Sequence, residues 1–299
     1  MSEYHIPVLL EQSVSALVGD PNGIYADATL GGGGHSREIL RRLGESGRLM
    51  SFDRDSDAIA GAPKDERITL IHNNFRFIHN YTLLHDVRFD GILADLGVSS
   101  HQFDTPERGF SFRFDSALDM RMNGEGDKTA ADVINSYDEE ALERIFRLYG
   151  EVDNARRAAR LIVAARSDSP VTTTSRLGEV LAPLTPSYAA HKYLAKVYQA
   201  LRIEVNEEMR SLEKFLSGAA ASLKPGGRLV VITYHSLEDR MVKNFIRSGN
   251  TEGTVIRDEY GRTNAPLSAV NRKPILPPEE EISANTRARS AKLRIAEKI

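Results

Sequence analysis

The chain has 299 residues, an apolar content of 41% and a formal net charge of −3, which suits one large α/β domain or two smaller ones. It has no run of about 18 apolar residues that could span a membrane, and its first residues lack the basic and apolar regions of a secretory signal. The absence of cysteine excludes disulfides, thiolate metal ligands and a cysteine nucleophile, and it fits an expected location in the cytoplasm.

The first predicted elements are a short strand, a glycine run and a helix. Residues 23–26 (GIYA) are typical of a strand, and residues 37–43 (REILRRL) are typical of a helix. Between them lies DATLGGGGHS, with glycine at positions 31–34. Because glycine lacks a Cβ, the backbone can approach a ligand closely and adopt a positive φ, and the helix start offers free N–H groups. This order of elements indicates a nucleotide-type cofactor site.

Three further strands are predicted at residues 49–53, 68–72 and 89–97. Strands that alternate with helices predict a parallel sheet covered on both faces, which binds ligands at the carboxyl ends of its strands. Asp27, Asp53 and Asp95 are therefore expected to converge on one edge of the sheet. Asp53 follows the glycines by about 20 residues, the offset at which a strand-end acid accepts hydrogen bonds from the ribose hydroxyls of an adenosine.

The glycine loop favours S-adenosylmethionine over NAD as the cofactor. A dinucleotide fingerprint requires G-x-G-x-x-G, but the third glycine position holds Ser36 when counted from Gly31 and Arg37 when counted from Gly32. The loop is nearer to the D/E-x-G-x-G form of S-adenosylmethionine methyltransferases, in which no pyrophosphate has to be bound. An NAD-dependent dehydrogenase stays as the alternative interpretation.

The α/β pattern is interrupted after the fourth strand. A loop rich in Gly, Phe and Asp is followed by predicted helices at 130–135, 138–149, 154–167, 174–184 and 187–204. The pattern resumes with a helix at 206–223, a strand at 228–234, a helix at 237–247 and a last strand at 290–298. We predict a doubly wound, mostly parallel, Rossmann-like α/β domain of residues 1–104 and 205–299, which binds S-adenosylmethionine. An all-helical substrate-recognition domain of residues 105–204 is inserted into it.

Three segments have features of an RNA contact. The loop around residues 103–121 combines Phe103, Phe110, Phe112 and Phe114 with Arg108, Arg113 and Arg121, the residue types that unpaired bases and phosphates require. Its alternative role is a hydrophobic plug between the two predicted domains, with solvated charges. Residues 262–299 carry eight Lys or Arg against four Glu, so RNA contacts are predicted there at Arg287, Arg289, Lys292 and Arg294. A short basic face in the nearly neutral insertion comprises Arg156, Arg157 and Arg160.

The chain resembles the bacterial ribosomal RNA small-subunit methyltransferase H family, also called MraW, over nearly its whole length. The shared motifs, in family order, are HIPVLL at 5–10, GGGHS at 32–36, FDRD at 52–55, DGILADLGVSS at 90–100, ERGFSF at 107–112, LDMRM at 118–122, QALRI at 199–203, YHSLEDR at 234–240 and RARS at 287–290. The chain departs from the family at Tyr234, where Phe is usual, at Thr286, where Pro is usual, and in residues 191–198.

This resemblance implies a function and a set of site residues. Family members transfer a methyl group from S-adenosylmethionine to N4 of a cytosine in the decoding centre of 16S ribosomal RNA, in the small ribosomal subunit. The cofactor contacts carry over to Gly33, Gly34, His35, Asp53, Phe75, Asp95 and Gln102. Asp95 is also the candidate catalytic residue, because an acceptor on the amine N–H would aid its attack. It could equally serve the cofactor alone, since residues 95–100 lack the D/N/S-P-P-Y/F motif usual in amine methyltransferases.

Other expectations concern partners and alternatives. No metal is expected, because the histidines and acids lack metal-ligand spacing, and no membrane partner is expected. The oligomeric state is left open, with a homodimer among the alternatives. His235 and its neighbours either face the RNA base or form a helix cap at Ser236 and Asp239. A non-catalytic RNA-binding assembly factor is the alternative to an enzyme.

Overall fold

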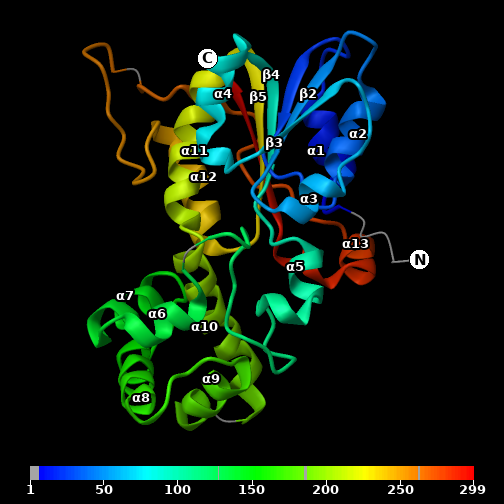
Figure 1. The fold of residues 1–299 in the computed structure, drawn as a ribbon. Helices are drawn as coiled ribbons and strands as arrows, with labels where there is room; N and C mark the ends of the chain where they lie inside the picture. The colour runs from blue at the N-terminus through cyan, green and yellow to red at the C-terminus, as the bar shows by residue number, and fades with distance from the viewer. Residues whose placement is uncertain (1–6, 127, 185–186, 262) are drawn as a thin grey trace. The chain divides into compact units, whose positions relative to one another are not determined.

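The computed structural model describes residues 7–126, 128–184, 187–261 and 263–299, and the chain divides into two compact units (Figure 1). The first unit consists of Met1–Gly97 and Met209–Ile299, and the second of Val98–Glu208. The predicted domain boundaries, at residues 105 and 204, lie inside the second unit. His5, which begins the HIPVLL motif, lies outside the described residues.

A seven-stranded sheet runs through the first unit in the order β3-β2-β1-β4-β5-β7-β6. The strands are β1 (Ile24–Asp27), β2 (Arg48–Asp53), β3 (Ile68–His72), β4 (Phe89–Asp95), β5 (Leu223–Thr233), β6 (Leu267–Ala269) and β7 (Lys292–Lys298). Strands β1 to β5 pair in parallel, whereas β7 is antiparallel to both β5 and β6. The predicted doubly wound, mostly parallel α/β fold is confirmed.

Helices cover both faces of this sheet (Figure 1). They are α1 (Leu10–Leu17), α2 (Gly34–Arg42), α3 (Ser56–Ala60), α4 (Ile78–His85), α11 (Glu208–Ser222), α12 (Ser236–Ser248) and α13 (Glu279–Ala284), with the short 3-10 helices η1 (Phe75–Phe77) and η5 (Thr286–Ser290). Because successive strand residues point to opposite faces, Phe52 and Val231 pack with α4, α11 and α12. Leu49 and Val230 pack with α1 and α2 on the other face. Burial on both faces explains why these strands are almost wholly apolar.

The second unit is built from helices around its own core. They are α5 (Ser100–Asp104), α6 (Ala130–Ser136), α7 (Glu139–Leu148), α8 (Ala155–Asp168), α9 (Thr174–Leu181) and α10 (Ala190–Val205), with the 3-10 helices η2 (Pro106–Arg108), η3 (Ala182–Leu184) and η4 (Ser187–Ala189). The apolar sides of α7 and α8, which correspond to two of the predicted helices, are buried together, as Ile145 and Ile162 illustrate. Among the described residues, no helix combines the length and apolar character that crossing a bilayer requires.

Helix α1 has no counterpart among the predicted elements, and its first turn depends on a distant residue. Leu9 precedes the helix with a left-handed backbone, φ 52°. Its N–H donates to Oε1 of Glu281 at 2.7 Å, and Glu281 lies 272 positions further along the chain. The sequence around residue 10 gives no indication of this distant partner.

Candidate active site

Three carboxylates mark the ends of neighbouring strands, as predicted. Asp27 ends β1, Asp53 ends β2 and Asp95 ends β4, and β1 pairs in parallel with both β2 and β4. The carboxyl ends of adjacent parallel strands lie at the same edge of a sheet, where such folds bind their ligands. The edge therefore presents a glycine loop and acids from three strands within one unit.

Asp27 is fully buried and holds the glycine loop to the sheet. Its Oδ2 accepts a hydrogen bond from Ser36 Oγ at 2.7 Å, and its Oδ1 accepts from the Thr29 N–H at 3.1 Å. Ser36 Oγ also lies 2.9 Å from Ser51 Oγ on β2. Burial raises the pKa of Asp27. Because no part of this side chain reaches solvent, Asp27 is a structural residue of the loop.

The four glycines of the loop have different surroundings. Gly31 and Gly33 adopt positive φ values of 48° and 72°, which residues with a Cβ rarely adopt. A Cβ on Gly32 would meet no atom within 4 Å, so this residue borders open space. A Cβ on Gly34 would overlap the ring of Pro7. The Arg37 guanidinium donates two hydrogen bonds to the Gly32 carbonyl, at 2.7 and 2.8 Å, and so fixes the loop from the first turn of α2.

Asp53 supports the loop and keeps acceptor capacity to spare. Its Oδ2 accepts from the Gly31 N–H at 2.8 Å, and its Oδ1 accepts from the Asp55 N–H at 2.9 Å. An ionised carboxylate offers about four acceptor positions, so each oxygen can take one further donor. The side chain is only partly buried, and burial raises its pKa against the opposing effect of the two backbone N–H groups. Adjacent hydroxyl groups, such as those of a ribose, match this pattern.

Phe75 is the first residue of η1, which follows β3. Strand β3 lies beside β2 in the sheet. Phe75 is half-buried, and its ring meets Phe215 of α11 edge to face, with centroids 5.1 Å apart. Packing against α11 fixes one edge of the Phe75 ring.

His35 and Asp95 approach each other from α2 and β4. The buried His35 ring has Nε2 3.2 Å from the carbonyl oxygen of Val8 and Nδ1 3.8 Å from Asp95 Oδ2. A carbonyl oxygen can only accept, so Nε2 carries the hydrogen of that bond and Nδ1 faces the carboxylate. The Asp95 side chain is 20% exposed, and burial raises its pKa, while the nearby His35 opposes that shift.

Tyr234, which directly follows β5, and Asp95 both lie next to Gly97. Burial, together with the negative charge of the Asp95 carboxylate, raises the pKa of Tyr234 well above its usual value. The Gly97 N–H donates to Asp95 Oδ1 at 3.3 Å. A Cβ on residue 97 would lie 2.8 Å from the Tyr234 ring, which explains why this position holds glycine. The sequence marks Tyr234 only as a departure from the family pattern and does not predict its place near Asp95.

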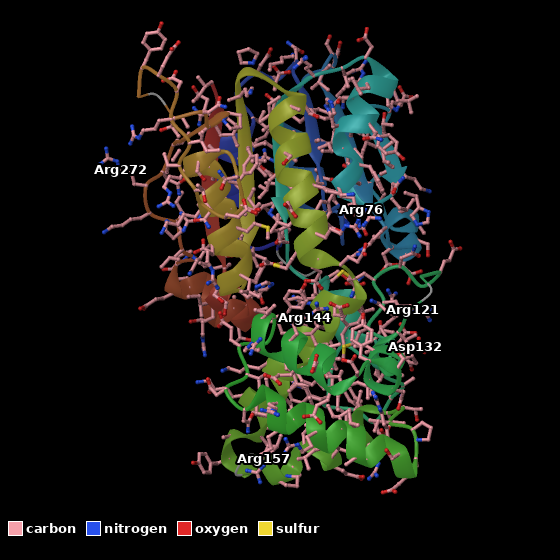
Figure 2. All side chains as sticks on the ribbon, turned by 90° about the vertical axis from the view of Figure 1, so that its left-hand side faces the viewer. Arg76, Arg121, Asp132, Arg144, Arg157 and Arg272 are labelled. Atoms are coloured by element: carbon pink, nitrogen blue, oxygen red, sulfur yellow. The ribbon has the colours of Figure 1, made fainter. Side chains whose placement is uncertain are left out.

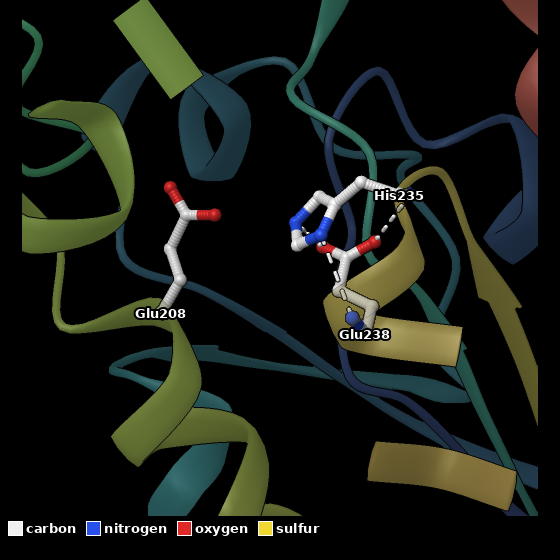
Figure 3. A group of neighbouring side chains, drawn as sticks. All are labelled: Glu208, His235 and Glu238. Carbon is white, nitrogen blue, oxygen red and sulfur yellow. Dashed lines mark hydrogen bonds and ion pairs between the residues drawn. The ribbon is translucent and has the colours of Figure 1, made fainter. Parts of the chain in front are cut away.

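His235 caps helix α12, one residue before the cap considered in the sequence analysis. Its Nδ1 accepts from the Glu238 N–H at 3.4 Å, and its Nε2 lies 3.0 Å from Glu238 Oε1 (Figure 3). Glu238 in turn accepts from the Tyr234 N–H at 2.8 Å. Residues 235 and 238 therefore form the capping box. Glu208, also labelled in Figure 3, belongs to the second unit, where Arg202 donates to both of its carboxylate oxygens.

Gln102 belongs to the second unit, unlike the other predicted cofactor contacts. It is buried, and its backbone N–H donates to the carbonyl and hydroxyl oxygens of Ser99 at 3.1 and 3.2 Å. The first unit brings together the glycine loop, His35, Asp53 and Asp95, with Phe75 on the adjoining strand connection.

The predicted RNA contacts fall into two groups. Lys292 and Arg294 pair with Asp239 at 3.4 and 2.7 Å. Arg294 is buried in this ion pair, whereas the Lys292 side chain keeps 41% of its surface exposed. Arg287 and Arg289 lie on η5 with exposed side chains.

The basic face of the second unit is partly neutralised. Arg156 and Arg160 lie 3.9 and 3.7 Å from Glu139. Arg157, labelled in Figure 2, lies near the start of α8 and lines an open cavity of about 470 Å³ that also contains acidic side chains.

A seven-stranded sheet in this order, with a glycine loop after the first strand and an acid at the end of the second, is the class I S-adenosylmethionine methyltransferase fold. The chain belongs to the MraW methylase family, whose model matches residues 2–299. It is 56% identical over 296 residues to the ribosomal RNA small subunit methyltransferase H of Bacteroides fragilis strain YCH46, covering 99% of this chain and 97% of that one. It is also 56% identical to the Flavobacterium johnsoniae protein of the same name, covering 99% and 98%.

Solved structures resemble the chain more distantly. An rRNA methylase from Streptococcus thermophilus aligns over 100% of this chain and 99% of its own, with a TM-score of 0.43 and 12% identity.

Proposed function

We propose that this protein transfers a methyl group from S-adenosylmethionine to RNA of the small ribosomal subunit, at N4 of a cytosine. The observation that carries the proposal is its membership of the MraW methylase family over residues 2–299, together with relatives named ribosomal RNA small subunit methyltransferase H. The N4 position and the decoding centre are taken from the resemblance of the sequence motifs.

The residues at the edge formed by the carboxyl ends of the strands, here called the rim, fit the proposed cofactor. Asp53 has acceptor capacity for two ribose hydroxyls beyond its two backbone donors. Gly32 borders open space, so the loop backbone can lie against a ligand. Phe75 offers an apolar surface for an adenine ring. Gly33, Gly34, His35, Asp95 and Gln102 are the remaining proposed contacts.

S-adenosylmethionine supplies an electrophilic methyl group on a sulfonium. The N4 amine of cytosine is a poor nucleophile, because its lone pair is delocalised into the ring. Asp95 would accept a hydrogen bond from this amine and take the proton that N4 must lose as its bond to the methyl carbon forms. The methyl–sulfur bond would break at the same time, and its electron pair would stay on sulfur as a neutral thioether. The Gly97 N–H would hold the Asp95 carboxylate in place. The rim would also align N4 with the methyl carbon, and such positioning lowers the barrier by several kcal/mol.

Calorimetry and methyl transfer test the proposal. Purified protein should bind S-adenosylmethionine and transfer tritiated methyl groups to small ribosomal subunits, and it should not bind NAD. Binding of NAD without S-adenosylmethionine would favour the dehydrogenase alternative. Cofactor binding without transfer to subunits or to naked 16S ribosomal RNA would favour the assembly factor.

A further inference from the structure

We propose that an exposed patch on the second unit stacks an unpaired base of the RNA substrate. The patch consists of Arg113, Phe114, Tyr188, His191 and Lys192, and we call it the Phe114 patch. The inference rests on the proposed function, since it assigns that function's substrate a surface outside the S-adenosylmethionine rim.

The aromatic residues of the loop divide into buried rings and one exposed ring. Phe110 is buried, and Phe103 and Phe112 pack against the same core of the second unit. Phe114 keeps 51% of its surface exposed. The first three rings therefore belong to the core of the second unit, whereas Phe114 remains accessible to a partner.

The backbone that carries Phe114 is held firmly, so its exposure is imposed by the fold. Thr174, in the first turn of α9, donates from Oγ1 to the Phe114 carbonyl at 2.7 Å. The Ser116 N–H donates to the same Oγ1 at 3.0 Å, and the Thr174 N–H donates to the Ser116 carbonyl at 2.9 Å. A ring presented from an ordered backbone loses little conformational freedom when it binds, which favours affinity.

Contacts between rings place α10 beside the loop. The Phe112 ring lies 5.6 Å from the ring of His191 and 5.1 Å from that of Tyr198, centroid to centroid. Phe114 is two residues from Phe112, a chain length that spans at most about 7 Å. His191 is exposed, and Tyr188, three residues before it, is 89% exposed. Several aromatic faces therefore lie within the reach of a few nucleotides.

The cations of the loop divide in the same way as its rings. Arg121, labelled in Figure 2, binds Asp119 at 2.6 Å, and Arg108 donates to the carbonyls of residues 121 and 122. Arg113 and Lys192 are exposed, and neither has an ion-pair partner among the described residues. The neighbouring acid, Asp115, is hydrogen-bonded to Ser175, which lowers its pKa. Two free cations beside exposed rings complement a strand with phosphates and bases.

This combination selects single-stranded RNA as the occupant. Aromatic side chains stack on bases that are free of a duplex, and Lys and Arg contact the backbone between them. A duplex hides the faces of its bases, so it would leave the exposed rings without a partner. The patch is expected to bind with little sequence preference, because every base has a face to stack.

Substitution of Phe114 tests the proposal directly. The probe is a 12-nucleotide uridine oligonucleotide, measured by fluorescence anisotropy, with duplex RNA of the same length alongside. Phe114→Ala should weaken binding of the single strand roughly tenfold, whereas Phe114→Tyr should stay within about twofold of the wild type. Tyr260→Ala, which removes a 76% exposed ring from the first unit, is the matched control and should bind like the wild type. The Arg113→Glu, Lys192→Glu double variant should flatten the salt dependence by about 1.4 in slope, for two lost phosphate contacts.

The contrary outcomes are equally definite. Unchanged binding by Phe114→Ala would overturn the inference, and so would equal losses with Ala and Tyr. A change from dimer to monomer in Phe114→Ala, with unchanged RNA affinity, would assign the patch to a second copy of the chain instead. Wild-type transfer of methyl groups to subunits separates the two proposals. If the wild type transfers them and Phe114→Ala has the same KM for subunits, this inference fails while the proposed function stands.

Discussion

Gly34 lies so close to Pro7 that a Cβ at position 34 would overlap the proline ring. The next residue, His35, bonds the carbonyl of Val8 in the same N-terminal segment. The fourth glycine of the run is therefore needed where α2 meets the segment before α1. Gly32, by contrast, borders open space, so we attribute the need for glycine at this position to the close approach of a ligand.

Alanine substitutions should separate these two roles. Gly34→Ala should lower the free energy of unfolding by about 1–3 kcal/mol, because overpacking forces the Pro7 segment to move. Gly32→Ala should keep the melting temperature within about 2 °C of the wild type, yet weaken S-adenosylmethionine binding, because its Cβ would occupy ligand space. Thermal melts and calorimetry measure the two effects. Gly19→Ala, also in open space but away from the loop, should change neither. Full cofactor affinity in Gly32→Ala would contradict the assignment.

Asp53→Asn should weaken S-adenosylmethionine binding at least tenfold, because a neutral amide has one acceptor oxygen where the carboxylate has two. Burial raises the pKa of Asp53 above its ordinary 3.8. Wild-type affinity should therefore fall as the pH is lowered through that raised pKa, and the variant should lack this dependence. Calorimetry at a series of pH values measures both. Asp65→Asn, which removes an acid paired with Arg67, should bind like the wild type. A tight-binding Asp53→Asn protein would remove the ribose assignment.

Asp95→Asn should stabilise the cofactor-free protein at neutral pH. Because burial raises the folded-state pKa of Asp95 above 3.8, the folded state binds its proton more tightly than the unfolded state. That contribution is complete below pH 3.8 and is lost as pH rises through the raised pKa. The variant avoids this loss, and its amide can donate to His35 Nδ1. We expect equal stabilities near pH 3.5 and a gain of about 1 kcal/mol at pH 7.5, measured by urea unfolding. A less stable variant at pH 7.5 would mean that the ionised Asp95–His35 contact is net stabilising.

Charge reversal at Arg287 and Arg289 should weaken binding of small ribosomal subunits and flatten its salt dependence, because fewer counterions are released. S-adenosylmethionine affinity should stay within about twofold, since exposed charges are screened beyond about 10 Å. Reversal of Arg272 and Lys273 makes the same change in net charge elsewhere in the basic segment. Equal effects from the two double variants would show that only overall charge matters. An unaltered salt slope in the first variant would place the RNA surface elsewhere.

The sheet and its rim could be predicted because their signals are local. Each strand is a short apolar run with a polar or glycine boundary, and parallel pairing follows from the helices between the strands. That topology places Asp27, Asp53 and Asp95 together without any knowledge of side-chain contacts. It does not separate them: only the structure shows that Asp27 is enclosed by Ser36 and Thr29.

Other features depend on contacts between residues far apart in sequence. The start of α1 requires Glu281, and Arg294 appeared to be a free cation until its partner Asp239 was known. Phe112 and Phe114 are the same residue type two positions apart, yet one is packed against a core and the other exposed. Composition predicts the chemistry of such segments, whereas packing decides which side chains stay available.

The product nucleoside is the most direct test of the proposed reaction. Small ribosomal subunits that lack the modification would be incubated with the protein and S-adenosylmethionine carrying a deuterated methyl group, and their RNA would be digested for mass spectrometry. We predict deuterium-labelled N4-methylcytidine with the wild type and at most traces with Asp53→Asn. No labelled N4-methylcytidine from the wild type, while the Bacteroides fragilis relative labels the same subunits in parallel, would contradict the proposed function.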